Sequence, residues 1–218
     1  MDSQDKNELQ QTDEARQQLL HSAVACFQEH GFTATQMSQI ADRAGVSEQI
    51  TLQYFPDKEA IVSALYADIE HQTAQQILTS PTKTMALNFE TALNLKLEQL
   101  TPYRSMFSES FHIAFKPNPD AQWVATRSTM MNAFQHIVSS ASDAPKGDHA
   151  RQFGAILYSI HLLMLLFWFY DSTENQKATH DMIKFSRDGL QWLRPMLILP
   201  PVSASIARLS KILEQVFA

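Results

Sequence analysis

Several features that define large classes of proteins are missing from this sequence. Cys26 is its single cysteine, which excludes an internal disulfide, and its position in an apolar helical pattern predicts a buried side chain. The sequence also has no glycine-rich phosphate loop, no Gly-x-Ser-x-Gly turn and no His-x-x-x-His pair for zinc. We therefore expect a protein that is not an enzyme and that has no catalytic residues, no cofactor and no metal site.

Glycine and long runs of β-branched alternation are scarce as well. The 218 residues include only 5 glycines, while hydrophobic residues make up 44% and charged residues 18%. That composition is typical of a globular chain, and apolar residues recur at helical spacing along most of it. The prediction is an all-α fold, in one domain or two.

No segment is predicted to span a membrane. The polar first residues, MDSQDKNELQQTDE, do not resemble a signal peptide. The most apolar stretch, 156–170, is shorter than the about 20 residues that a span requires, and it is too apolar all round for a surface helix. We expect a cytoplasmic protein in which this stretch is buried on more than one side.

The most informative stretch runs from Thr35 to Lys58, TQMSQIADRAGVSEQITLQYFPDK, and predicts a helix-turn-helix at about residues 35–55. Gly45 suits the left-handed backbone at the end of the first helix. Ser47 is a good N-cap for the second helix, and Asp57 can cap the helix that follows. The first helix has an apolar face at i, i+3, i+4 and i+7, formed by Met37, Ile40, Ala41 and Ala44.

The second helix of this motif is predicted to have distinct inner and outer faces. Thr51 and Phe55 are four residues apart and should point inward. A short helix with an exposed polar and aromatic face suits the major groove of DNA, where glutamine pairs with an adenine edge and isoleucine contacts a thymine methyl. The side chains expected to point outward together are Gln49, Ile50, Gln53 and Tyr54.

These residues and their spacing resemble the N-terminal DNA-binding domain of the TetR family of helix-turn-helix transcriptional regulators. The resemblance covers about residues 13–75 and includes Gly31-Phe32, Ala44-Gly45-Val46-Ser47 and Tyr54-Phe55-Pro56-Asp57-Lys58-Glu59. It implies an N-terminal three-helix DNA-binding domain followed by a C-terminal helical domain for ligand binding and dimerisation. In the family pattern Thr35 caps the second helix and touches a phosphate, and Tyr54 and Lys58 hold phosphates. The DNA contacts implied in this way are Thr35, Gln36, Ser47, Gln49, Ile50, Gln53, Tyr54 and Lys58.

The resemblance also implies how the chain is divided. We expect a disordered tail over residues 1–12, the DNA-binding domain with its connecting helix over 13–78, and the helical effector-binding and dimerisation domain over 82–218. In the family the last two long helices form a four-helix bundle across a dimer, which places the homodimer interface at about 150–171 and 176–194. The alternative for these two helices is an ordinary intramolecular core.

The second domain is rich in methionine and aromatic residues. In a regulator of this family such residues line an apolar pocket for a small effector, and methionine adapts to irregular shapes. The alternative for each of them is ordinary core packing. The predicted pocket residues are Met106, Phe107, Phe111, Trp123, Arg127, Met130, Met131, Phe134, His161, Met164 and Trp168.

The leading hypothesis is therefore a TetR-like repressor that leaves a palindromic double-stranded DNA operator when a small apolar effector binds. Its partners are DNA, the effector and a second copy of the chain. By linkage, the effector can act only as far as its affinity differs between two shapes of the dimer.

The charge of the DNA-binding half favours a second hypothesis. The whole chain has a net charge of −6, and residues 1–56 carry three bases against eight acids, which gives −5. Lysine and arginine normally supply much of the affinity for DNA by neutralising phosphates. Gln49, Thr51 and Leu52 also depart from the usual family pattern. The alternative is a dimeric small-molecule carrier or interaction protein with a helix-turn-helix that no longer binds DNA.

A third hypothesis is a helical metalloenzyme. Glu109 and His112 form a Glu-x-x-His step, but di-iron helical bundles use two such steps and two further carboxylates. The sequence has no second step, so this hypothesis lacks half of its ligands.

Overall fold

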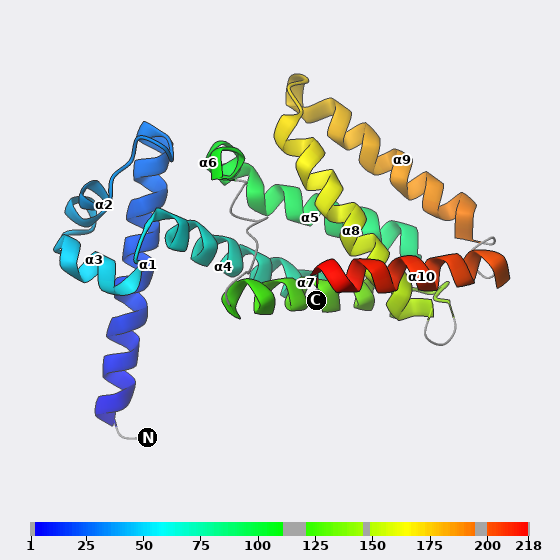
Figure 1. Ribbon diagram of the computed structural model, residues 1–218, viewed down its shortest axis with the longest axis horizontal. Helices are drawn as coiled ribbons and strands as arrows, with labels where there is room; N and C mark the ends of the chain where they lie inside the picture. The colour runs from blue at the N-terminus through cyan, green and yellow to red at the C-terminus, as the bar shows by residue number, and fades with distance from the viewer. Residues whose placement is uncertain (1–2, 111–120, 146–148, 195–199, 218) are drawn as a thin grey trace. The chain divides into compact units, whose positions relative to one another are not determined.

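The computed structural model of the chain describes residues 3–110, 121–145, 149–194 and 200–217 (Figure 1). These residues are helical with no strand, which confirms the all-α prediction. Two short 3-10 helices, Thr101–Tyr103 and Glu174–Gln176, accompany the α-helices. The α-helices are α1 (Ser3–His30), α2 (Met37–Ala44), α3 (Glu48–Tyr54), α4 (Lys58–Thr79), α5 (Met85–Leu100), α6 (Arg104–Ser110), α7 (Ala121–Ser139), α8 (His149–Tyr170), α9 (Lys177–Leu193) and α10 (Pro200–Phe217).

The helices group into two compact units. The first comprises the described residues of 1–66 and 103–118, and the second those of 67–102 and 119–218. One helix, α4, is shared: its first residues belong to the first unit and its remainder to the second. The chain therefore leaves the first unit along α4 and returns to it for α6 before completing the second.

The first unit is built on α1, against which α2 packs, with α3 following α2 (Figure 1). Its core combines Leu19 and Phe27 of α1 with Ile40 of α2 and Phe55, all almost fully buried. The ring of Phe32, in the turn after α1, lies 5.4 Å from the ring of Phe27. This turn is thereby held against α1 and sets where α2 begins.

Helix α1 begins at Ser3, so the prediction of a disordered tail over residues 1–12 is wrong for residues 3–12. No glycine or proline separates these residues from the apolar stripe that starts near Asp13. Glutamine, glutamate, lysine and leucine all favour helices, and Asp5 and Glu8 suit the positive end of the helix dipole. An apolar stripe is therefore not needed for this segment to be helical.

After α5, Thr101–Tyr103 forms a 3-10 turn, and α6 runs from Arg104 to Ser110 within the first unit. There α6 contacts α1, and the ring of Phe107 lies 5.7 Å from that of Tyr66 in an edge-on arrangement. Residues 111–120 lie outside the described residues.

The second unit has α8 at its centre, in contact with α5, α7, α9 and α10. Trp168 of α8 and Phe134 of α7 are fully buried, and the Phe134 ring lies 6.0 Å from that of Phe89 on α5. Helices α7 and α8 approach most closely at Gly154, where a Cβ atom would stand 2.6 Å from the Cα of Gln135. This glycine is needed for the close approach of two backbones.

Helix α8 agrees with the predicted range of about 150–171 and extends beyond the apolar stretch 156–170, so its length does not exclude a membrane span. It has 22 residues with a mean hydropathy of 1.8 over its most apolar window, enough by length and composition to cross a membrane. Half of that window is buried inside the protein, however, and the core helix of a soluble protein passes the same test. Burial of Phe153, Leu157 and Leu165 agrees with the expected core position.

A buried carboxylate fixes the junction between α8 and α9. Asp171 accepts hydrogen bonds from the backbone N–H and hydroxyl of Thr173 and from those of Thr179, at 2.6–2.9 Å. These bonds hold the pKa of Asp171 well below its usual range. The carboxylate thus sets the direction in which α9 leaves α8.

The close approach of α7 and α8 can be tested with Gly154→Ala. The added Cβ meets backbone atoms of Gln135, which a side-chain rotation cannot relieve. We expect a loss of about 1–3 kcal/mol in the free energy of unfolding, measured by chemical denaturation at fixed protein concentration. Arg151→Ala, at an exposed position of the same helix, is the control and should change stability by less than about 0.5 kcal/mol. Equal stability of the two variants would contradict the close contact.

Candidate functional site

Helices α2 and α3 form the predicted helix-turn-helix. Gly45 has a φ of 70°, the left-handed conformation expected at the end of α2. The Ser47 hydroxyl accepts a hydrogen bond from the backbone N–H of Ile50, so Ser47 caps α3 as predicted. Asp57 accepts from the backbone N–H of Ala60 at 2.7 Å at the start of α4.

The two faces of α3 are the ones predicted. Thr51 and Phe55 are buried, and the Thr51 hydroxyl donates to the carbonyl of Ser47, so its polarity is satisfied within the helix. On the other face Gln49 and Gln53 are exposed, Tyr54 is half-buried and Ile50 is 41% exposed. Leu52 is exposed as well, at 43%. The outer face of α3 therefore offers two amide side chains beside apolar groups.

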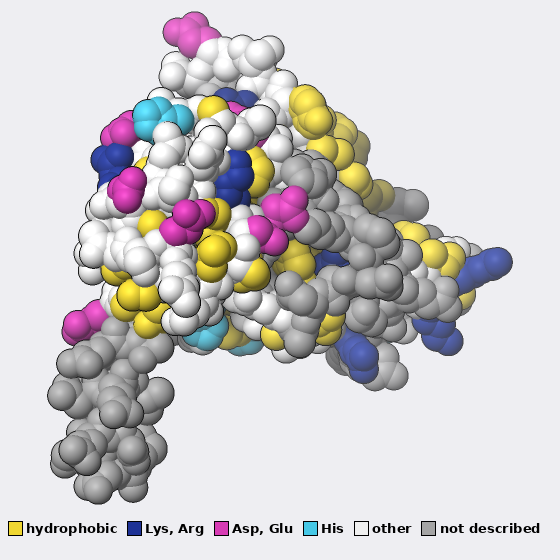
Figure 2. Space-filling view, turned by 60° about the vertical axis from the view of Figure 1, so that its left-hand side comes forward, with side chains coloured by type: hydrophobic (Ala, Val, Ile, Leu, Met, Phe, Trp, Pro, Cys, Tyr) yellow, Lys and Arg dark blue, Asp and Glu magenta, His cyan; other side chains and the backbone are white. Residues whose placement is uncertain are grey.

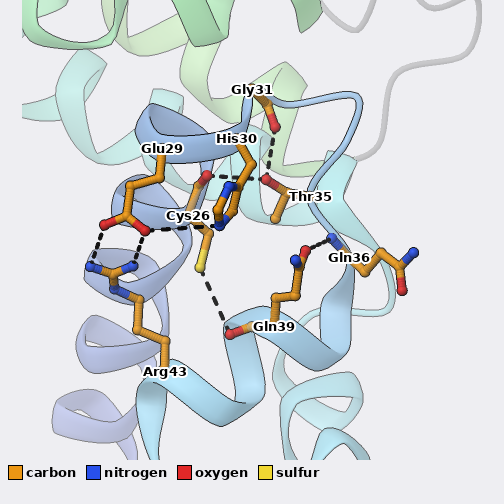
Figure 3. A network of polar contacts seen from close by, with 8 residues as sticks. All are labelled: Cys26, Glu29, His30, Gly31, Thr35, Gln36, Gln39 and Arg43. Atoms are coloured by element: carbon orange, nitrogen blue, oxygen red, sulfur yellow. Dashed lines mark hydrogen bonds and ion pairs between the residues drawn. The ribbon is translucent and has the colours of Figure 1, made fainter.

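Thr35 is not the N-cap of α2, contrary to the prediction. The cap is Gln36, whose backbone N–H donates to the side chain of Gln39 at 2.8 Å (Figure 3). Thr35 is only 1% exposed, and its hydroxyl lies within hydrogen-bond distance of the carbonyls of Gly31 and Cys26. The Thr35 side chain thus closes the turn after α1, and sequence alone could not separate this role from capping one residue later.

Lys58 and Glu109 hold the same turn from two further helices of the first unit. The Lys58 ammonium, at the start of α4, donates to the carbonyls of Phe32 at 2.7 Å and Thr33 at 3.1 Å. It also lies 4.9 Å from the centre of the Phe32 ring. From α6, Glu109 accepts a hydrogen bond from the backbone N–H of Thr33 at 3.3 Å. The turn that leads into α2 is therefore attached to both α4 and α6.

The surface of the first unit has no large basic patch on the face that Figure 2 brings forward, where acidic and basic side chains are interspersed. Arg43 of α2 forms a two-pronged ion pair with Glu29 of α1, at 2.7 and 2.8 Å. This pair lies close to the helix-turn-helix (Figure 3) and compensates one of the few positive charges there.

A second arrangement of functional side chains lies in the core of the second unit. Glu70 of α4 and Lys96 of α5 form an ion pair and are about 1% and 0% exposed. The imidazole of His161 on α8 is also fully buried, 4.8 Å from the Phe134 ring centre and 5.7 Å from that of Tyr158. Three helices, α4, α5 and α8, thus bring an acid, a base, an imidazole and a phenol together inside an aromatic core.

Burial governs the protonation of these groups. It lowers the pKa of His161 to about 3, with the Lys96 charge acting in the same direction and the Tyr158 carbonyl opposing it. Burial also lowers the pKa of Lys96, against the effect of Glu70. The pKa of Tyr158 is raised by burial and then by Glu70, with Arg127 opposing. At neutral pH, His161 and Tyr158 are therefore uncharged.

The structure places the predicted pocket residues in different surroundings. Met106 and Phe107 are buried in the first unit, and Phe111 lies outside the described residues. The others belong to the second unit, where Arg127 and Met131 are half-buried. Fully or nearly buried there are Trp123, Met130, Phe134, His161, Met164 and Trp168.

The sequence interpretation missed Glu70 and Lys96. Both carried a detectable pattern, because Lys96 stands seven residues after Phe89 in the buried stripe of α5. Glu70 likewise shares a buried stripe of α4 with Thr73, Ala74 and Ile77. A charged residue at a core position of a helical stripe indicates a buried pair, although only the fold identifies the partner.

Comparison with known proteins agrees with this architecture. Residues 19–65 match the sequence profile of "Bacterial regulatory proteins, tetR family". Residues 19–65 therefore form a DNA-binding domain of the TetR type. A stretch of 51 residues is 43% identical to the HTH-type transcriptional regulator RutR of Escherichia coli K12, a match that covers 23% of this chain and 24% of that protein. The match therefore spans about a quarter of the length of this relative. The HTH-type transcriptional activator FasR of Mycolicibacterium smegmatis is 24% identical over 186 residues, which cover 82% of this chain and 84% of FasR.

Solved structures share the fold of this protein. A TetR transcriptional regulator from Nitrosomonas europaea aligns with a TM-score of 0.61 at 19% identity, over 82% of this chain and 98% of its own. Thermus thermophilus FadR, a repressor solved with lauroyl-CoA, aligns with a TM-score of 0.60 at 18% identity, over 84% of this chain and 95% of its own. At these identities the similarity shows the fold alone.

The uncharged state of buried His161 predicts how the stability of the fold depends on pH. The unfolded chain takes up a proton at His161 near pH 6.5, whereas in the folded protein, with a pKa of about 3, the imidazole stays uncharged. The contribution of His161 to the free energy of unfolding is therefore fully present above pH 6.5 and is lost progressively as the pH drops toward 3. One proton corresponds to about 1.4 kcal/mol per pH unit, so about 2 kcal/mol should be lost between pH 8 and pH 5.

The measurement is denaturant unfolding of the wild type and of His161→Phe at several pH values and one protein concentration. The difference between the two proteins isolates His161 from the carboxyl groups, which titrate in both. Parallel pH profiles would show that the imidazole is not buried in neutral form.

Proposed function

We propose that this protein is a cytoplasmic, homodimeric transcriptional regulator of the TetR family that binds a palindromic DNA operator through α3. The observation that carries the proposal is the exposed outer face of α3, where Gln49, Ile50 and Gln53 project from a helix capped by Ser47. Glutamine can make two hydrogen bonds to an adenine edge, and isoleucine can contact a thymine methyl.

In this proposal, few positively charged side chains are available to bind the phosphates of DNA. Arg43 is paired with Glu29, and Lys58 already donates to two backbone carbonyls. Neutral donors, namely Tyr54, Gln36 and backbone N–H groups at helix starts, would supply the remainder. Affinity should then fall with salt less steeply than for a regulator with many lysines and arginines.

The dimer is proposed to form through α8 and α9. Both helices expose large apolar side chains that no other part of this chain covers among the described residues. On α8, Leu163 is 65% and Tyr170 79% exposed, and on α9 Phe185 is 72% and Trp192 86% exposed. Gly189 of α9 has no atom within 4 Å of an added Cβ, which leaves room for a second helix.

The second unit is proposed to bind a small, largely apolar effector and to act as a repressor domain. Its buried methionine and aromatic residues and its polar cluster support this role. Two similar folds were solved with acyl-CoA ligands, T. thermophilus FadR with lauroyl-CoA and Bacillus subtilis FadR with stearoyl-CoA. Effector binding would reach the DNA-binding unit along α4, whose first residue, Lys58, holds the turn before α2.

The first experiment is selection of bound duplexes from a random library at low and moderate salt. Enrichment of a palindrome with half-sites about 34–36 Å apart is expected for a two-fold helix-turn-helix dimer. A folded dimer that enriches no sequence at either salt concentration would instead favour the carrier hypothesis.

With the selected operator, Gln53→Ala should weaken binding by about 1–3 kcal/mol and relax preference at one base pair, because one bidentate contact is lost. Binding is measured by fluorescence anisotropy, and circular dichroism checks the fold. Gln72→Ala, an exposed glutamine of α4, is the matched control and should bind as the wild type does. Unchanged affinity of Gln53→Ala would remove Gln53 from the reading face.

For the dimer, Phe185→Glu should produce a folded monomer at micromolar concentration, since it places a charge in an apolar interface. Sedimentation equilibrium gives the mass. Leu78→Glu changes an exposed leucine of α4 in the same way and should remain dimeric. A dimeric Phe185→Glu would move the interface elsewhere.

A further inference from the structure

Three polar atoms in the core of the second unit lack hydrogen-bond partners. Among the residues that the structure describes, they are Oε2 of Glu70 and both ring nitrogens of His161. The backbone carbonyl of Tyr158 lies near enough to the imidazole to raise the pKa of His161, but it is not in hydrogen-bonding geometry with either ring nitrogen. All three belong to side chains that are at most 1% exposed. Leaving a buried polar atom unpaired costs free energy, so this arrangement is suited to a group that is brought in from outside.

The hydrogen-bonding character of the three atoms is defined. Glu70 is engaged with Lys96 through Oε1, which leaves Oε2 as an acceptor. Uncharged His161 offers one N–H donor and one acceptor nitrogen. The two ring nitrogens point away from each other, so one ligand group can reach Oε2 of Glu70 and one ring nitrogen. It must donate to Oε2 and either donate to or accept from that nitrogen.

Aromatic rings surround this polar cluster. The centre of the Phe134 ring lies 4.8 Å from that of His161, 6.0 Å from that of Tyr158 and 6.0 Å from that of Phe89. A ligand that reaches the cluster would thus place its polar end at Glu70 and His161 and its body among apolar side chains.

We propose that the cluster of Glu70, Lys96 and His161 recognises the uncharged polar end of an otherwise apolar effector, with a primary amide or similar donor–acceptor group as the best match. A primary amide supplies two N–H donors and one carbonyl acceptor, so it can donate to Oε2 and still pair with the ring nitrogen, whether that nitrogen is protonated or not. An alcohol supplies one of each. This inference specifies the effector class of the regulator proposed above and rests on that function.

An anionic end is disfavoured by the same groups. A carboxylate only accepts hydrogen bonds, so it could pair with a ring N–H of His161 but not with Oε2 of Glu70. It would also bring a second negative charge beside Glu70, whose charge is already compensated by Lys96. Like charges at close range in a buried site repel strongly.

The test compares three probes with one alkyl chain, octanamide, octanol and octanoate, bound to the full-length protein at pH 8. Isothermal titration calorimetry gives each dissociation constant without DNA. We expect octanamide to bind about ten-fold more tightly than octanoate, with octanol between them.

Two variants of one position make the test specific. His161→Phe removes both ring nitrogens while retaining an aromatic core, and it should reduce the preference for octanamide about ten-fold. His161→Gln restores one donor and one acceptor and should recover part of the preference. Ser159→Ala removes a hydroxyl that only bonds within α8 and should leave all three constants unchanged.

The outcomes separate the alternatives. Tighter binding of octanoate, or equal binding of all three probes, would overturn the neutral-end proposal. Absence of binding by any probe would also overturn it and indicate a site satisfied by buried water. Because the assay contains no DNA, its failure leaves the operator selection unaffected, and failure of that selection would leave ligand recognition standing.

Discussion

The ion pair between Glu70 and Lys96 is the interaction on which the arrangement of the second unit depends. Removing one partner of such a buried pair leaves an uncompensated charge and costs about 3–5 kcal/mol. The pair joins α4 to α5 at a point where both side chains are hidden from water. A hydrophobic pair of the same volume would pack there at least as well, so the charges are better explained by recognition or switching than by stability.

In the first unit the constraint is a different one: few positive charges lie near the short helix α3, because Arg43 is paired with Glu29 and Lys58 donates to backbone carbonyls. Three attachments fix the turn before α2: the Thr35 hydroxyl, the Lys58 ammonium and the Glu109 carboxylate. They leave α3 as a rigid support for neutral side chains. Rigidity matters more here than in a strongly basic domain, since hydrogen bonds to base edges depend on direction whereas attraction to phosphates does not.

Local chemistry decided which parts of this structure were predictable from the sequence. Gly45, Ser47 and the inward pair Thr51 and Phe55 act through neighbours within one or two turns, so spacing was enough to place them. The start of α1 was missed because helices were predicted from apolar periodicity, which residues 3–12 lack. Glu70 and Lys96 were missed because their partners lie on different helices, and only tertiary structure pairs them.

Helix α4 connects the two constraints. Lys58 at its first residue holds the turn before α2, and Glu70 on the same helix is paired in the second unit. In the proposed function, a ligand that pairs with Oε2 of Glu70 would therefore act on the helix that also carries Lys58. Such a ligand could shift α3 only by the difference in its affinity for two states of the protein. Hydrogen bonds depend on direction, so a polar contact at Glu70 is suited to provide such a difference.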